Sequence, residues 1–254
     1  MKNNVDFKSK IISELEQNVD FKSVENLEFF KRVHATPTEI YEQRLKQIKF
    51  HNNEQILDAG CGFGQWTLPL SSLNKNVIGF DLSIDRVKIT NILKSKMNVT
   101  NLSLVSSITE QIPFKNNSFD CIFCYSVIYS TNYEKTLKEF FRILKPNGKL
   151  YLVTNDLGWY LKLLFSNHNS TIDYSSRKKA YNVLKYHLLS FFRKQNQKID
   201  VFLPPKKLIN SLKKIGFKEI ILDSEGKINS NSKSSSFYSD FMGFRCVYEV
   251  ISKK

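Results

Sequence analysis

Short apolar runs alternate with helix-like stretches over residues 54–156, and this alternation limits the folds open to the chain. Parallel strands need crossover connections long enough to hold a helix, so strands that alternate with helices predict a mostly parallel sheet. The runs are apolar at successive positions, which favours strands covered on both faces. We therefore expect an α/β fold of the doubly wound, Rossmann-like kind. The five expected strands lie at 54–60, 75–83, 102–107, 119–126 and 148–156.

The segments on either side of this alternation are expected to be largely helical. Residues 1–50 have helical apolar spacing, and we interpret them as an N-terminal extension to a domain that spans 51–254. Residues 157–202 interrupt the alternation and predict a cap of two helices, inserted after the fifth strand. A further helix and two strands complete the domain. These lie at 205–217, 218–223 and 244–252, and the apolar stripes of the extension are Ile11, Ile12 and Leu15, then Ile40, Leu45 and Ile48.

The segment LDAGCGFG follows the first expected strand and opens a helix. Glycines at such a turn let the backbone approach a ligand closely. A dinucleotide fingerprint has the spacing GxGxxG, whereas the glycines here are Gly60, Gly62 and Gly64. The carboxylate of Asp58 would repel a pyrophosphate and suits a ligand with an ammonium group. Asp81 ends the second strand, at the spacing of an acid that binds the hydroxyls of a ribose.

Three further blocks follow the glycine segment ILDAGCGFG at 56–64, namely VIGFDLS at 77–83, IPFKNNSFDCIFC at 112–124 and RILKPNGKLYL at 142–152. With these four blocks the sequence resembles the class I S-adenosylmethionine-dependent methyltransferases, in their small-molecule branch. The resemblance implies a seven-stranded sheet whose last strand is antiparallel. It also implies a methyltransferase that uses S-adenosylmethionine as the donor and releases S-adenosylhomocysteine.

The resemblance also implies donor contacts, residue by residue. Asp58 and the glycine backbone would hold the methionine part, Asp81 the ribose and Leu82 the adenine. Relatives often carry an acid that accepts from the adenine amino group, where this chain has Ser-Ile-Thr at 107–109. The expected donor contacts are Asp58, Gly60, Cys61, Gly62, Gly64, Asp81, Leu82, Ser107, Ile108, Thr109 and Tyr125.

Methyl transfer asks little of the protein beyond aligning the acceptor and excluding water. An acceptor hydroxyl would benefit from a base, whereas a carboxylate or an amine needs none. Tyr129 and His168 are weak candidates for a catalytic residue. Ligands in this fold bind beyond the carboxyl ends of the strands, so the cap should lie over the acceptor. Tyr129, Trp159 and Tyr160 are the expected substrate contacts.

The C-terminal part of the chain carries most of the net charge of +14. Residues 177–214 hold eleven basic side chains against one acid, Asp200. Such a segment suits an acidic metabolite, a nucleic acid or an anionic membrane surface. Three functions therefore stay open. They are a methyltransferase for a small molecule that is acidic or linked to a sugar or lipid, an RNA methyltransferase that uses the basic segment, and a non-catalytic cofactor-binding protein.

Cys121 and Cys124 form a CxxC pair inside the fourth expected strand. Residues three apart on a strand point to opposite faces, so the pair cannot converge on one ion, and we expect no metal site. The cysteine usage suits a reducing compartment. The first residues lack an apolar core of signal-peptide length, and we expect a cytoplasmic protein.

Overall fold

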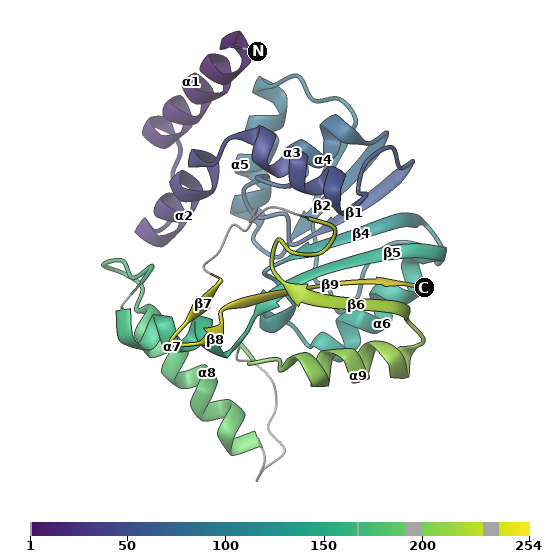
Figure 1. Cartoon of the computed structure of the whole chain (residues 1–254). Helices are drawn as coiled ribbons and strands as arrows, with labels where there is room; N and C mark the ends of the chain where they lie inside the picture. The colour runs from purple at the N-terminus through teal and green to yellow at the C-terminus, as the bar shows by residue number, and fades with distance from the viewer. Residues whose placement is uncertain (1, 167, 191–199, 231–238) are drawn as a thin grey trace.

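A seven-stranded sheet forms the centre of the computed structural model, which describes residues 2–166, 168–190, 200–230 and 239–254 (Figure 1). The strand order is β3-β2-β1-β4-β5-β9-β6, and only β9 runs antiparallel to its neighbours. The expected doubly wound fold with an antiparallel last strand is confirmed. The strands are β1 (Gln55–Ala59), β2 (Asn76–Asp81), β3 (Leu102–Ser106), β4 (Phe119–Tyr125), β5 (Leu144–Asn155), β6 (Lys218–Ser224) and β9 (Val247–Lys253).

Helices cover both faces of the sheet and bury a separate apolar layer on each. Side chains of α1 to α5 join one layer, and those of α6 and α9 join the other. The helices are α1 (Lys2–Asn18), α2 (Val24–Ala35), α3 (Thr38–Gln47), α4 (Thr67–Leu73), α5 (Ile84–Lys96), α6 (Tyr133–Ile143), α7 (Leu157–Ser166), α8 (Ser176–Ser190) and α9 (Pro205–Ile215).

The two cysteines of β4 show how a buried strand serves both layers. Cys121 packs with the layer of α1 to α5, and Cys124 packs with the layer of α6 and α9. Their expected orientation to opposite faces is confirmed. Burial raises the pKa of the Cys121 thiol to about 12, so both pack as small apolar side chains. Within the described ranges, no three His, Cys, Asp or Glu side chains are grouped as a metal site would require.

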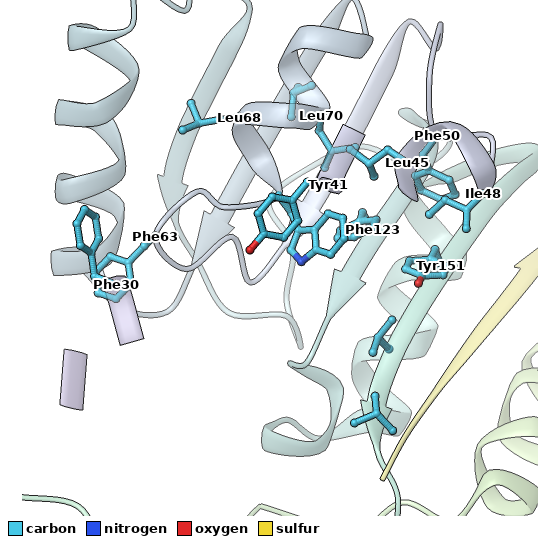
Figure 2. Packing of buried hydrophobic residues seen from close by; sticks show 14 of the residues in the cluster. Phe30, Tyr41, Leu45, Ile48, Phe50, Phe63, Leu68, Leu70, Phe123 and Tyr151 are labelled. Carbon is cyan, nitrogen blue, oxygen red and sulfur yellow. The ribbon is translucent and has the colours of Figure 1, made fainter. Parts of the chain in front are cut away.

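The N-terminal helices pack directly onto the glycine segment. The ring of Phe63 lies 5.4 Å from that of Phe30 and 5.6 Å from that of Phe29, both on α2. Figure 2 shows Phe30 and Phe63 beside one another. His34, also on α2, has Nε2 3.1 Å from the carbonyl oxygen of Phe63. Burial lowers the pKa of His34 to about 3, so the ring is neutral and Nε2–H donates to that carbonyl. The extension therefore supports the conformation of the glycine segment, although its division from the domain stays a prediction.

A buried ion pair joins α3, in the N-terminal extension, to β9, the strand that follows β5 in the sheet. Arg44 on α3 contacts Glu249 on β9, with Nη2 2.5 Å from Oε2, and both side chains are almost fully buried. Tyr151 donates its hydroxyl to the same carboxylate oxygen at 2.6 Å. The backbone of Ile228 completes the network, since its N–H donates to Glu249 and its carbonyl accepts from Arg44. The network links four segments that are far apart in sequence.

The cap follows β5, as expected, and consists of α7 and α8 with a small hairpin against α7. The hairpin strands are β7 (Asp240–Phe241) and β8 (Phe244–Arg245), so the apolar run at 244–252 divides into β8 and β9. Gly158 allows the close packing, because a Cβ there would lie 2.1 Å from the carbonyl oxygen of Phe244. Part of the predicted cap, residues 191–199, lies outside the described residues. One stripe residue of the extension, Ile40, is exposed, so its assignment to the apolar face was wrong.

Arg44→Met should lower the free energy of unfolding by about 3–5 kcal/mol, because it leaves the Glu249 carboxylate buried without its cation. Chemical denaturation followed by circular dichroism measures this loss. Lys96→Met is the matched control, since it removes the cation from the exposed pair with Glu14 and should cost less than about 1 kcal/mol. Equal losses in the two variants would show that the buried network contributes nothing special.

Candidate active site

A cavity of about 950 Å³ opens beyond the carboxyl ends of β1, β2, β4 and β5. The strand order reverses between β1 and β4, which is where open α/β sheets bind their ligands. Further walls come from α2, from α7, from the loop before α8 and from the loops that follow β3 and β4. Single-ligand pockets occupy about 300–1,000 Å³. This cavity is at the upper end of that range, so it has space for a second small molecule beside a nucleoside-sized one.

Gly60 turns the chain out of β1 in a conformation that requires glycine. Its φ is +83°, and a Cβ there would lie 2.2 Å from Cγ2 of Val127. The N–H groups of Gly60 and Cys61 both donate to the carbonyl of Phe80, at 2.8 and 2.9 Å. The turn is thereby tied to the end of β2, one residue before Asp81.

The carboxylate of Asp81 is fixed against the glycine segment by two backbone hydrogen bonds. Gly62 N–H donates to Oδ2 at 3.0 Å, and Ser83 N–H donates to Oδ1 at 2.9 Å. The side chain lines the cavity. Because each carboxylate oxygen accepts more than one hydrogen bond, Asp81 keeps capacity for two hydroxyl groups of a ligand.

The structure brings eight of the eleven expected donor contacts to the cavity wall. Asp58, Cys61 and Gly64 lie behind that wall instead. Gly64 is packed against α5, where a Cβ would lie 2.7 Å from Cγ2 of Thr90. The part that each of the eleven takes in binding stays a prediction. The eight at the wall are Gly60, Gly62, Asp81, Leu82, Ser107, Ile108, Thr109 and Tyr125.

Asp58 is a buried carboxyl directly behind the glycine segment. Thr67 donates its hydroxyl to Oδ2 of Asp58 at 2.5 Å. Burial raises the pKa of Asp58 to about 7, and the nearby Asp81 adds to the rise. Asp58 is therefore only partly ionised near neutral pH, and a cation in the cavity would favour its ionised form.

Two apolar side chains, and an acid that the sequence analysis did not single out, line the part of the cavity beside the Ser-Ile-Thr sequence at 107–109. Leu82 and Ile108 both line the cavity and are 74% and 44% exposed, so their apolar surfaces are available to a flat ring. Glu110 also lines this end, directly after Thr109. Its carboxylate accepts from the hydroxyl of Thr109 at 3.1 Å and from the backbone N–H of Asn132 at 2.8 Å. An acid thus stands one position beyond the Ser-Ile-Thr sequence at 107–109.

Tyr125, the last residue of β4, lines the cavity. Its ring packs 4.7 Å from that of Trp66, and its hydroxyl donates to Oε1 of Glu225 at 2.7 Å. Glu225 follows β6 and is buried. This bond joins the cavity wall to a segment 100 residues away, which no local pattern in the sequence could indicate.

The predicted substrate contacts gather on the cap side of the cavity. Tyr129, Trp159, Tyr160 and His168 all line it. Burial raises the pKa of Tyr129, although Lys179 opposes the rise, so its hydroxyl stays protonated and can donate a hydrogen bond. Burial, followed by the charges of Lys162 and Arg32, lowers the pKa of His168, so its ring is neutral near pH 7. Of the two catalytic candidates, only His168 is thus in a form that can accept a proton.

Lys179 is the one basic residue of the described part of 177–214 that lines the cavity. Its Nζ lies 2.6 Å from Oδ2 of Asp200 and 5.9 Å from the ring centre of Tyr129. Burial alone would lower the pKa of Lys179, but Tyr129 and Asp200 together raise it, so the ammonium stays charged. The other described basic side chains of the segment lie elsewhere on the molecule.

The N-terminal extension supplies a wall that the sequence analysis missed. Phe29 and Arg32 on α2 line the cavity, and Arg86 at the start of α5 joins them. Arg32 also donates to Oδ1 of Asn169, in the loop before α8, at 3.2 Å. The two guanidinium groups lie 5.5 and 5.3 Å from the ring centre of Phe29. The helical spacing of 1–50 shows that an apolar face exists, but it does not show which part of the fold that face covers.

Comparison with known proteins gives this geometry a family context. Residues 57–152 match the methyltransferase domain family. An uncharacterised protein of Methanocaldococcus jannaschii is 28% identical over 223 residues, which cover 85% of this chain and 82% of that protein. A demethylmenaquinone methyltransferase of Oceanobacillus iheyensis is 29% identical over 113 residues, which cover 43% of this chain and 48% of the enzyme. The chain therefore spans less than half the length of that enzyme.

Two solved structures share the fold. One is an S-adenosylmethionine-dependent methyltransferase of Thermotoga maritima, described as a possible histamine N-methyltransferase, with a TM-score of 0.56, 21% identity and coverage of 92% of this chain and 97% of that one. The other is a geranyl diphosphate methyltransferase in complex with S-adenosylmethionine, with a TM-score of 0.57, 13% identity and coverage of 87% and 86%.

The matched domain and the strand order support a class I S-adenosylmethionine-dependent methyltransferase. The named relatives and structural neighbours differ in the molecules that their names specify. The family match therefore implies S-adenosylmethionine as the methyl donor and leaves the acceptor to be argued from the cavity.

The affinity for S-adenosylmethionine should rise by up to about tenfold between about pH 6 and pH 8, because a ligand cation is attracted by the ionised form of Asp58. The raised pKa has the opposite effect on the free protein, whose protonated Asp58 contributes stability at low pH that is lost as pH rises through about 7.

Isothermal titration calorimetry at several pH values measures this dependence. Asp58→Asn is the control, because it removes the titrating group and retains the shape. The variant should lose the part of the pH dependence that belongs to Asp58. An unchanged pH dependence in the variant would show that another group is responsible.

Proposed function

We propose that this chain binds S-adenosylmethionine at the glycine-turn end of the cavity and methylates a small, mainly apolar acceptor at the cap end. The observation that carries the proposal is the continuity of the cavity. One space is lined by Asp81 and Leu82 at one end and by Trp159, Tyr160 and Leu163 at the other. A donor and an acceptor can therefore meet without crossing bulk water.

The residues at the glycine-turn end fit the donor. Asp81 would accept hydrogen bonds from the two ribose hydroxyls, and Leu82 and Ile108 would cover the adenine ring. Glu110 would accept from the adenine amino group, in the role for which relatives often have an acid. The partly ionised Asp58 favours a ligand that carries an ammonium group. When bound, the sulfonium supplies an electrophilic methyl group.

The cap end favours an apolar acceptor with a polar group. Its walls include the aromatic and aliphatic side chains of Trp159, Tyr160 and Leu163, and Lys179 and the hydroxyl of Tyr129 are among its hydrogen-bond donors. Relatives named demethylmenaquinone methyltransferase and sterol 4-C-methyltransferase support acceptors of this character. The side chains would orient the acceptor and exclude water, which accounts for most of what such a reaction requires.

Proton transfer is needed only where the acceptor atom carries a proton. The neutral ring of His168 is then the proton acceptor that the cavity offers, and the protonated hydroxyl of Tyr129 orients the substrate. RNA as the acceptor has less support, because Lys179 is the described basic residue of 177–214 that reaches the cavity. A purely non-catalytic role has less support as well, since the donor end and the acceptor end are joined.

A transfer assay with methyl-labelled S-adenosylmethionine and a cell extract tests the proposal. After reaction, the extract is separated into organic-soluble molecules, aqueous metabolites, protein and RNA. The label should enter the organic-soluble fraction. Label confined to RNA, or no incorporation by protein that binds the donor, would contradict the proposal.

Two aromatic truncations, one on α7 and one on β8, sharpen this assay. Trp159→Ala should reduce incorporation by about tenfold or more, because it removes a large side chain from the acceptor wall. Phe244→Ala on β8 is the matched control, since Phe244 is 47% exposed and does not line the cavity, so its loss should change transfer little. Both variants should bind S-adenosylhomocysteine as the unmodified chain does.

A further inference from the structure

One face of α8 carries basic and apolar side chains together, and α8 contains no acidic residue. Lys178, Tyr181, Lys185 and Leu188 follow one another at steps of three, four and three residues, which places them on the same side of the helix. The Nζ of Lys185 lies 5.8 Å from the ring centre of Tyr181. Tyr181 is 56% exposed and Leu188 is 63% exposed. We refer to these four residues as the α8 outer face.

Two more exposed apolar residues lie close to the start of this helix. Arg177 donates through Nε to the carbonyl of Leu164 at 2.8 Å, so the beginning of α8 lies against the end of α7. Phe165, next along α7, is 65% exposed, and Ile172, in the loop between the two helices, is 93% exposed. Figure 1 shows α7, α8 and this loop on one side of the molecule, away from β6.

This surface borders the cavity. Thr171 and Tyr174, on either side of Ile172 in the loop, both line the cavity. Lys179 also lines it, from the opposite side of α8 to the outer face. A molecule held at the α8 outer face is therefore separated from the acceptor end by one helix and one short loop.

The charge of the region is complementary to an anionic surface. Residues 157–190 expose three basic side chains, Arg177, Lys178 and Lys185, and their single acid is Asp173. Cations alone would suit nucleic acid equally well. Exposed leucine, isoleucine and phenylalanine side chains make no favourable contact with a phosphate backbone. Their entry into the interfacial region of a bilayer is favourable, because it removes apolar surface from water. The combination favours lipid.

We propose that the α8 outer face, with Phe165 and Ile172, docks on an anionic lipid bilayer, from which an apolar acceptor enters the cavity. The entry route rests on the proposed function, whereas the docking does not. Among the described helices, none has the length and hydropathy required to cross a bilayer. Docking would place apolar side chains at the level of the lipid headgroups and lysines against their charges.

Co-sedimentation with vesicles tests the docking. One set of vesicles contains phosphatidylcholine alone, and the other contains about one third phosphatidylglycerol. The chain should bind the anionic vesicles more tightly, and added salt should weaken that binding. Lys178→Gln with Lys185→Gln should reduce affinity by roughly thirtyfold, since each lysine near an anionic surface contributes about fivefold. Tyr181→Ser with Leu188→Ser should also reduce it, by removing the apolar contribution.

The matched control is Lys213→Gln with Lys214→Gln on α9, which removes the same charge from another exposed part of the basic segment. This pair should retain most of the binding. An equal loss in the control, no binding to anionic vesicles, or binding to total RNA alone would each overturn the proposal. Titration with S-adenosylhomocysteine separates the methyltransferase assignment from the docking. If the methyltransferase assignment is wrong, the chain should not bind S-adenosylhomocysteine. If only the docking is wrong, that binding should be unchanged.

Discussion

Gly60 leaves β1 at a point where any side chain would meet Val127, and the backbone there adopts a positive φ that glycine accepts readily. The same turn directs two N–H groups to the carbonyl of Phe80. That tie holds the end of β2 against the end of β1 and presents Asp81 to the cavity. The position of the donor end therefore depends on one tight turn at the point where the strand order reverses.

The N-terminal helices add a wall to this general arrangement. The neutral ring of His34 and the two phenylalanines of α2 hold Phe63 from one side. The ion pair of Arg44 with Glu249 ties α3 to β9, on the other side of β5. Breaking such a buried pair is costly, so the helices are held firmly in place. The cap supplies another wall, and the space between them determines which acceptors fit.

Much of the fold could be predicted from the sequence because its signals are local. The apolar runs predict the strands, and the glycine spacing predicts the turn. The place of Asp81 at the end of β2 predicts that it lines the ligand site. The opposed cysteines of β4 follow from strand geometry alone. Tertiary contacts decide the rest. Nothing near Phe29 or Glu225 in the sequence shows that these residues meet the cavity or its wall, and the spacing of eleven basic residues does not reveal that Lys179 faces inward. Ile40 has the right spacing for an apolar face but has no neighbour to cover it.

The central claim is that the carboxylate of Asp81 holds the ribose of S-adenosylmethionine. The most direct measurement is the affinity for that donor by calorimetry, in the unmodified chain and in Asp81→Ala. Loss of a charged acceptor for two hydroxyl groups should weaken binding by roughly tenfold to a hundredfold or more. Asp85→Ala, four residues along and outside the cavity wall, should leave affinity almost unchanged. Equal affinity in Asp81→Ala and the unmodified chain, or no binding by the unmodified chain, would contradict the claim.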